Sequence, residues 1–207
     1  MMNDKNLVLY NSFYIWAIDA GHGIDTNGKR SPVWDDGSQL FEWEYTRKIR
    51  RKLIEFLDLY KISYFIVNPE AEDISLEERV DRINKVRRET GQEVITISIH
   101  GNAAGTEHAS GYEVFTSPGQ TRSDILAEVF FKHAERTEMF KMRKDTSDGD
   151  NDKEARFYML KKTNGPALLT ESGFYTNEEE CKRMLNDFFV LRIAVMHLTA
   201  IIEIENE

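Results

Sequence analysis

The stretch YIWAIDAGHG, residues 14–23, joins a run of apolar residues to a histidine that stands between two glycines. A short apolar run that ends at glycine predicts a buried strand. Glycine lets the backbone turn sharply and leaves room beside it, so we expect the turn to present His22 to a metal ion or a substrate. The stretch therefore predicts both a buried strand and a functional histidine at its carboxyl end.

Strands and helices alternate along the rest of the chain. Apolar and β-branched runs predict further strands at residues 61–68, 93–100, 111–117, 157–160 and 166–174. Apolar residues at helical spacing predict helices at residues 41–60, 75–89, about 121–140, and from about 177 toward the C-terminus. This alternation predicts an α/β fold with a mainly parallel sheet covered on both faces, in a single domain over residues 1–207.

Composition excludes several classes of protein. The net charge of −9 argues against nucleic acid as the main partner, because phosphate binding requires a basic face. The chain has no apolar stretch of the roughly 18 residues that a membrane span needs. The single Cys181 rules out an intrachain disulfide. Residues 1–16 lack the basic start and long apolar middle of a secretory signal. Nothing in the composition indicates the oligomeric state.

Three titratable residues stand at the ends of predicted strands, namely His22, His100 and Glu171. Ligands gather beyond the carboxyl ends of the strands in sheets of this kind. Two imidazoles and one carboxylate form a familiar zinc site with an open position for water. Glu42 and Glu44 are the carboxylates nearest to His22 in sequence, and position alone leaves either as the third ligand. Glu171 would then act as the general base in hydrolysis of an amide bond.

Each of these residues also has a purely structural interpretation. His100 would bond to backbone at a strand end, and Glu171 would be a solvated carboxylate. Glu42 and Glu44 would favour a helix N-terminus through its dipole. Asp19, which precedes the turn, would either orient His22 or simply stabilise the turn. No local motif such as HExxH decides between the two interpretations.

Five blocks carry a resemblance to a known family. They are IDAGHG, LFEWEYTRKIRRKL, SIHGNA, GYEVFTSPG and FYMLKKTNGPALLTESGFYTNEEE, in this order. Together they resemble the zinc-dependent N-acetylmuramoyl-L-alanine amidases of the amidase-3 type, from about Trp16 to the final helix. The resemblance implies a three-layer αβα sandwich with a twisted central sheet. It implies peptidoglycan as substrate, zinc as cofactor, and hydrolysis of the amide between N-acetylmuramic acid and L-alanine.

The resemblance also implies roles for individual residues. His22, Glu42 and His100 match the zinc ligands of the family, and Glu171 matches its catalytic glutamate. Asn102 matches the asparagine of the second histidine block, which we expect to line the substrate site.

Some positions depart from the family pattern. Glu44 does not fit the ligand spacing and is interpreted as a helix-surface residue. Ala20 stands where many members have proline, and Gly101 where alanine or serine is frequent. Neither residue is a ligand, so the departures leave the expected chemistry unchanged.

The remaining polar and titratable residues are expected to be structural. The polar stretch 143–156 is interpreted as a solvated loop that could cover the groove. Its acidic part, DTSDGDND at residues 145–152, lacks the spacing of a calcium loop. His108 and His133 are expected to be surface or helix residues, and His197 is expected to be packed or exposed on the last helix. Cys181 has no neighbour in sequence that would activate its thiol.

Two alternatives and the site of action stay open. The chain could be a peptidoglycan-binding module without catalysis, or a zinc peptidase that cuts within the stem peptide. We expect action at the cell wall, in the periplasm or outside the cell. With no recognisable signal, delivery would be as a phage lysin (an endolysin) or as an exported autolysin whose leader has been removed.

Overall fold

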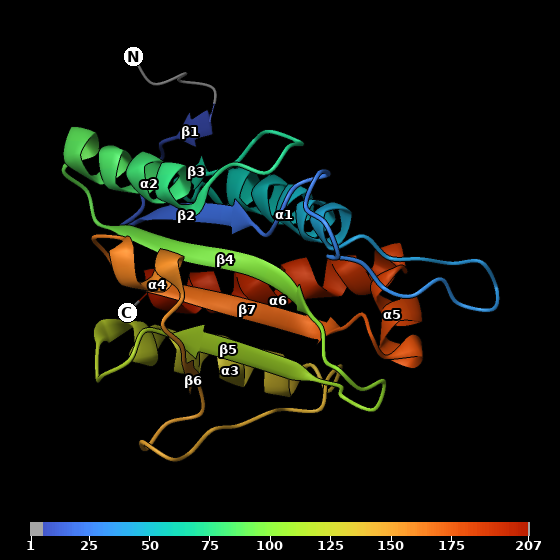
Figure 1. The fold of residues 1–207 in the computed structure, drawn as a ribbon. Coiled ribbons are helices and arrows are strands. Elements are labelled where there is room, and N and C mark those ends of the chain that lie inside the picture. Colours follow the sequence, from blue (N-terminus) through green and yellow to red (C-terminus); the bar gives the residue numbers. More distant parts are fainter. Residues whose placement is uncertain (1–5, 207) are drawn as a thin grey trace.

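The computed structural model describes residues 6–206, and these residues form a seven-stranded sheet with helices on both faces (Figure 1). The strands are β1 Leu7–Val8, β2 Ile15–Ala20, β3 Tyr64–Ile66, β4 Val94–Asn102, β5 Tyr112–Thr116, β6 Lys153–Glu154 and β7 Ala167–Phe174. The helices are α1 Glu42–Tyr60, α2 Leu76–Thr90, α3 Arg122–Arg136, α4 Tyr158–Lys162, α5 Glu178–Met184 and α6 Asp187–Glu205.

The strand order is β1-β3-β2-β4-β7-β5-β6, and the central strands β3, β2, β4 and β7 are parallel. β5 is antiparallel to β7. No helix connects β4 to β5, so β5 starts at the rim where β4 ends and runs back along the sheet. The prediction of a mainly parallel sheet is confirmed.

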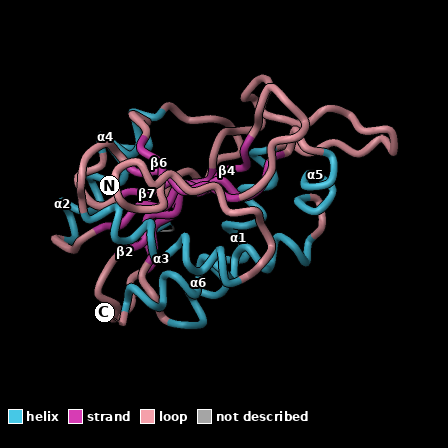
Figure 2. Tube along the Cα trace, turned by 90° about the horizontal axis from the view of Figure 1, so that it is seen from below, coloured by secondary structure: helices cyan, strands magenta, loops and turns pink. Residues whose placement is uncertain are grey.

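The three layers are visible when the sheet is seen edge-on (Figure 2). Helices α1, α3 and α6 pack together on one face, whereas α2 and α4 cover the other. Successive β2 side chains pack on opposite faces of the sheet. Trp16 and Ile18 belong to the larger hydrophobic core, and Ile15 and Ala17 belong to the smaller one. Strands that are buried on both faces are typical of parallel sheets. The predicted αβα sandwich is therefore confirmed.

Three element predictions are wrong. The strand expected at 157–160 is the short helix α4, because Met159 and Leu160 pack inward while basic residues follow them. The helix expected to reach residue 140 ends at Arg136. The single final helix is broken near Asn186, whose side chain accepts hydrogen bonds from the first turn of α6. Side-chain capping of this kind starts a new helix.

The N-terminal stretch that we judged against secretory signals lies partly outside the described residues. From residue 6 to residue 206, no helix combines the length and hydrophobicity needed to cross a bilayer.

Candidate metal centre and active site

The turn after β2 is tightly packed against β4. Gly21 N–H donates to the carbonyl of Ile99, and His22 adopts a left-handed backbone with φ of 62°. A Cβ atom on Gly21 would lie 2.3–2.8 Å from the ring of His100. The glycine therefore makes room for the second histidine, and not for the metal or substrate that the sequence suggested. The left-handed conformation costs His22 about 1–2 kcal/mol, which the surrounding contacts must offset.

A buried ion pair beneath the turn holds it in place. Arg79 of α2 donates to Asp19 Oδ1 at 2.7 Å and to the Ala20 carbonyl at 3.0 Å. The second oxygen of Asp19 accepts from Ser98 Oγ at 2.6 Å. Arg79 also reaches the His22 carbonyl at 3.5 Å. Asp19 thus stabilises the turn through Arg79 and does not touch the imidazole of His22.

Glu42 is the first residue of α1, and its side chain is almost fully buried at 1% exposure. Its backbone N–H donates to the Lys29 carbonyl, which fixes the start of the helix beside the turn. Glu42 Oε1 lies 3.0 Å from His100 Nδ1, and Oε2 lies 3.4 Å from His22 Nε2. Glu42 is therefore the carboxylate that joins the two histidines, as the resemblance implied.

The three side chains form a possible metal site. Their ligand atoms all lie within 4.8 Å of one another, and Glu42 Oε2 is buried without a hydrogen-bond partner. Burial raises the pKa of Glu42, but His100 and His22 outweigh it and hold the pKa well below its usual value. Burial lowers the pKa of His100, but Glu42 outweighs it and raises the pKa. Two imidazoles and one carboxylate suit zinc, with room for a further ligand.

Glu171 stands beside this cluster on β7, directly across from His100 in the register of the two strands. Its Oε2 is buried and makes no hydrogen bond. Burial raises the pKa of Glu171 to about 8; Glu42 adds to the rise and His100 opposes it. A carboxyl group with a raised pKa at the edge of a possible metal site has the properties of a proton-transfer group.

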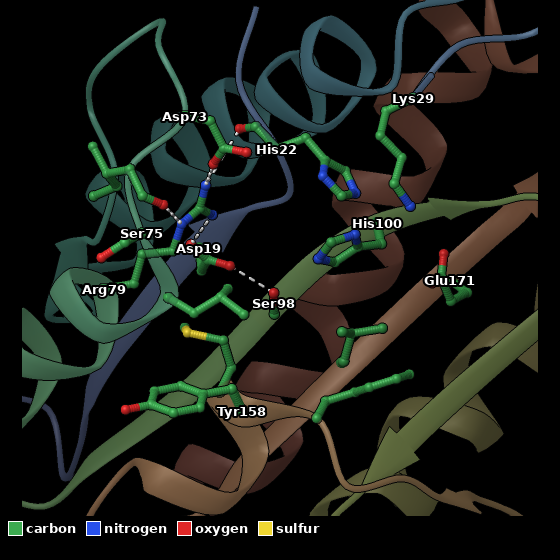
Figure 3. Close-up of a pocket in the computed structure, with 15 residues that line it drawn as sticks. Asp19, His22, Lys29, Asp73, Ser75, Arg79, Ser98, His100, Tyr158 and Glu171 are labelled. Carbon is green, nitrogen blue, oxygen red and sulfur yellow. Dashed lines mark hydrogen bonds and ion pairs between the residues drawn. The ribbon is translucent and has the colours of Figure 1, made fainter. Parts of the chain in front are cut away.

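A cavity of about 590 Å³ contains these groups (Figure 3). His22, His100 and Glu171 line one part of it, together with the side chain of Lys29. The rest of the wall includes the apolar residues Ile74, Leu76, Phe157, Met159 and Leu169. Sequence reasoning missed Lys29 and this apolar wall; the basic residue shortly after the GHG turn was the available signal for Lys29. The cavity can hold a substrate that is partly apolar and carries a polar group at the metal end.

Asn102 does not line this cavity. Its amide donates to Glu113 Oε2 at 2.8 Å, and its oxygen accepts from the Ala103 N–H at 2.8 Å. Glu113 also pairs with Arg143 and Lys153 from the polar stretch 143–156. Substrate contact by Asn102 therefore stays a prediction, while its observed contacts tie β4 to β5.

The other histidines lie in different surroundings, and His108 is exposed. His197 is buried, with Nε2 lying 3.0 Å from Thr170 Oγ1. His133 pairs with Glu203 at 2.8 Å. Glu44 lies on the surface of α1, with its carboxylate 3.1 Å from the ammonium of Lys48.

Comparisons with known proteins identify relatives of the chain. The family model described as N-acetylmuramoyl-L-alanine amidase matches residues 17–203. The chain is 27% identical over 186 residues to the N-acetylmuramoyl-L-alanine amidase CwlM of Bacillus licheniformis, covering 87% of this chain and 64% of that protein. It is 26% identical over 201 residues to an endolysin of Bacillus phage SPP1, covering 93% of this chain and 66% of that protein. The chain thus spans just under two thirds of both relatives.

Solved structures share the fold. An N-acetylmuramoyl-L-alanine amidase from Clostridium difficile 630 superposes with a TM-score of 0.80 at 24% identity, covering 93% of this chain and 96% of that one. The catalytic domain of CwlV from Bacillus (Paenibacillus) polymyxa superposes with a TM-score of 0.72 at 23% identity, covering 92% and 97%.

Proposed function

Because the chain belongs to the N-acetylmuramoyl-L-alanine amidase family, we propose that it hydrolyses the amide bond between N-acetylmuramic acid and L-alanine in peptidoglycan. The observation that carries the proposal is the cluster of His22, Glu42 and His100, whose two histidines line one cavity together with Glu171. These residues come from four separate parts of the sequence. We propose that the chain forms a single catalytic domain.

We propose zinc as the metal, held by His22, Glu42 and His100. The buried Oε2 of Glu42 supports this assignment, because it makes no hydrogen bond and lies 3.4 Å from His22 Nε2, so it is available to a cation beside that imidazole. When bound, zinc polarises the substrate carbonyl, activates a water molecule and favours the ionised form of a neighbouring carboxylate.

Glu171 carries the proton in this proposal. In its ionised form it accepts a proton from the attacking water and then donates it to the leaving nitrogen of L-alanine. The water supplies hydroxide to the carbonyl carbon, the C–N bond breaks, and the released amine keeps the proton. The raised pKa of Glu171, about 8, suits a group that must both take and return a proton near neutral pH.

Digestion of purified sacculi tests the proposal. Zinc-loaded wild-type protein should release stem peptides that begin with L-alanine, as identified by mass. The variant Glu171→Gln should lower the rate by about 10²–10⁴-fold, because the side chain keeps its shape but cannot accept the proton. Zinc content, measured on the same samples, should be unchanged.

Two results would replace the proposal by another function. Products that leave L-alanine on the glycan would show a peptidase that cuts within the stem. Sedimentation with sacculi without any release, in a protein that retains zinc, would show a binding module.

A further inference from the structure

The polar stretch 143–156 contains a carboxylate that is not solvated. Asp152 is only 1% exposed, whereas Asp148 in the same stretch is exposed. The expectation of a solvated loop is therefore wrong for Asp152. The reason is that the short strand β6, which begins at Lys153, pairs with β5 and draws Asp152 against the end of that strand.

Asp152 shares a single hydroxyl group with a second carboxylate. Thr116 Oγ1 lies 2.7 Å from Asp124 Oδ1 and 2.7 Å from Asp152 Oδ2. A hydroxyl has one hydrogen to donate, so it can satisfy only one of these two oxygens. The other carboxyl oxygen must carry a proton or face a cation.

Two more carboxylate oxygens in the cluster have no donor at all. Asp152 Oδ1 and Asp150 Oδ1 are both buried and make no hydrogen bond. Burial raises the pKa of Asp152 to about 7 against the opposing hydrogen bond of Thr116, and the neighbouring carboxyl groups of Asp150 and Asp124 add to the rise. A buried carboxylate among like charges is costly unless a positive charge compensates it.

Nearby basic side chains do not supply that charge. Lys153 pairs with Glu113 at 2.6 Å. Glu113 lies opposite Glu171 in the register of β5 and β7. Lys144 pairs with Glu135 at 3.0 Å. Within residues 6–206, the ion pairs involve none of the three cluster aspartates.

We propose that Asp150 and Asp152 bind a calcium ion, with Asp124 adding negative charge and Thr116 holding the carboxylates in place. Calcium takes six to eight oxygen ligands and accepts carboxylates, backbone carbonyls and water together. The cluster offers only oxygen atoms, which excludes it as a second zinc site of the imidazole type. The ion would fasten the stretch 143–156 to β5 and to the start of α3.

The place of the cluster gives the ion a consequence for the active site. Asp152 directly precedes Lys153, whose ammonium holds Glu113, and Glu113 lies opposite Glu171 in the β5–β7 register. Fastening Asp152 therefore keeps Lys153 in place beside β5, which in turn pairs with β7, the strand that carries the proposed catalytic residue. The binding itself does not depend on the proposed hydrolysis.

Calorimetric titration and thermal unfolding test this inference on the full, zinc-loaded chain, without chelators. Calcium chloride should bind with half-saturation at about 0.1–1 mM, the range of sites with few charged ligands. At calcium concentrations about 100-fold above that value, the Tm should rise by roughly 5 °C. Magnesium chloride at the same concentrations should give a much smaller rise, because magnesium gives up its water reluctantly.

Two variants and a matched control make the result specific. Asp152→Asn should lose the calcium response, and its Tm without calcium should be higher than that of the wild type at pH 8, because a buried charge is removed. Asp150→Asn should also weaken calcium binding. Asp148→Asn removes an exposed carboxylate from the same loop and should bind calcium as the wild type does.

The inference fails if wild-type protein shows neither binding heat nor a Tm shift with calcium. It also fails if Asp148→Asn weakens the response as much as Asp152→Asn does, since that would show diffuse attraction to an acidic loop. An equal response to magnesium would likewise show general screening of charge.

Discussion

The proposed metal centre and the aspartate cluster place buried carboxylates in opposite electrostatic surroundings. Glu42 lies between His100 and His22, and these two imidazoles keep its pKa well below the usual value despite its burial. Asp152 lies among other carboxylates, and its pKa is raised to about 7. Burial alone therefore does not decide whether a carboxyl group is ionised; the groups that surround it decide this. Nitrogen and oxygen donors together suit zinc, whereas oxygen donors alone suit calcium.

The two regions also differ in how the fold supports them. The metal centre stands on β2, α1 and β4, and the buried pair of Asp19 and Arg79 braces its turn. The aspartate cluster depends on a loop that is held by the two-residue strand β6. We therefore expect the metal centre to be preorganised, and the aspartate cluster to depend more on its ion.

Removal of the carboxylate that joins the histidines should have the largest effect. Glu42→Gln should weaken zinc binding by more than about 100-fold, because even outer partners of metal ligands cost 10–100-fold. Amidase activity at limiting zinc should fall in parallel. Zinc competition with a chromogenic chelator measures the affinity.

Glu44→Gln is the matched control, because it changes the same residue type two positions later on the exposed side of α1. It should leave zinc affinity unchanged. Equal losses in the two variants would contradict the assignment of Glu42 as a ligand.

The brace beneath the turn should have the next largest effect. Asp19→Asn removes the buried one of the two carboxylates that pair with Arg79, while Asp73 at 2.6 Å remains. The free energy of unfolding should therefore fall by up to about 3–5 kcal/mol. Zinc affinity should fall by about 10–100-fold as the turn that carries His22 loosens. Urea denaturation and zinc competition measure the two effects.

A partly exposed ion pair, made by another arginine of the same helix, provides the comparison. Glu70→Gln breaks the contact of 2.9 Å with Arg82. Surface pairs contribute about 0–1 kcal/mol, so this variant should unfold almost like the wild type and keep its zinc. A stable Asp19→Asn protein with full zinc affinity would show that the turn keeps its conformation without the ion pair between Asp19 and Arg79.

The sequence predicted the metal centre better than the aspartate cluster, for physical reasons. His22 and His100 follow strands whose apolar pattern is strong, so their place at one rim could be inferred. Position near His22 left Glu42 and Glu44 equivalent; the resemblance selected Glu42, and the structure shows why, since only Glu42 turns inward. The burial of Asp152 depends on pairing between β5 and β6, which are far apart in sequence, and two residues of strand carry no readable period.

The smallest expected effect is the dependence of the Tm on pH, to which both regions contribute. Between about pH 4.5 and 8, folded metal-free protein keeps a proton on Glu171 that the unfolded chain has released. Stability therefore falls as pH rises through this window, and Asp152 contributes with the same sign between about 3.8 and 7. The raised pKa of His100 acts in the same direction, since its stabilisation is lost as pH rises through the folded pKa. We expect the Tm of metal-free protein to fall on the order of 5 °C from pH 5 to pH 8.

Glu171→Gln and Asp152→Asn should each remove part of this slope. Zinc should reverse the part that belongs to the metal centre, because metal ligands bind better when they are deprotonated. A metal-free Tm that rises with pH would mean that neither carboxyl group holds a proton in the folded chain, and the contrast between the two regions would be lost.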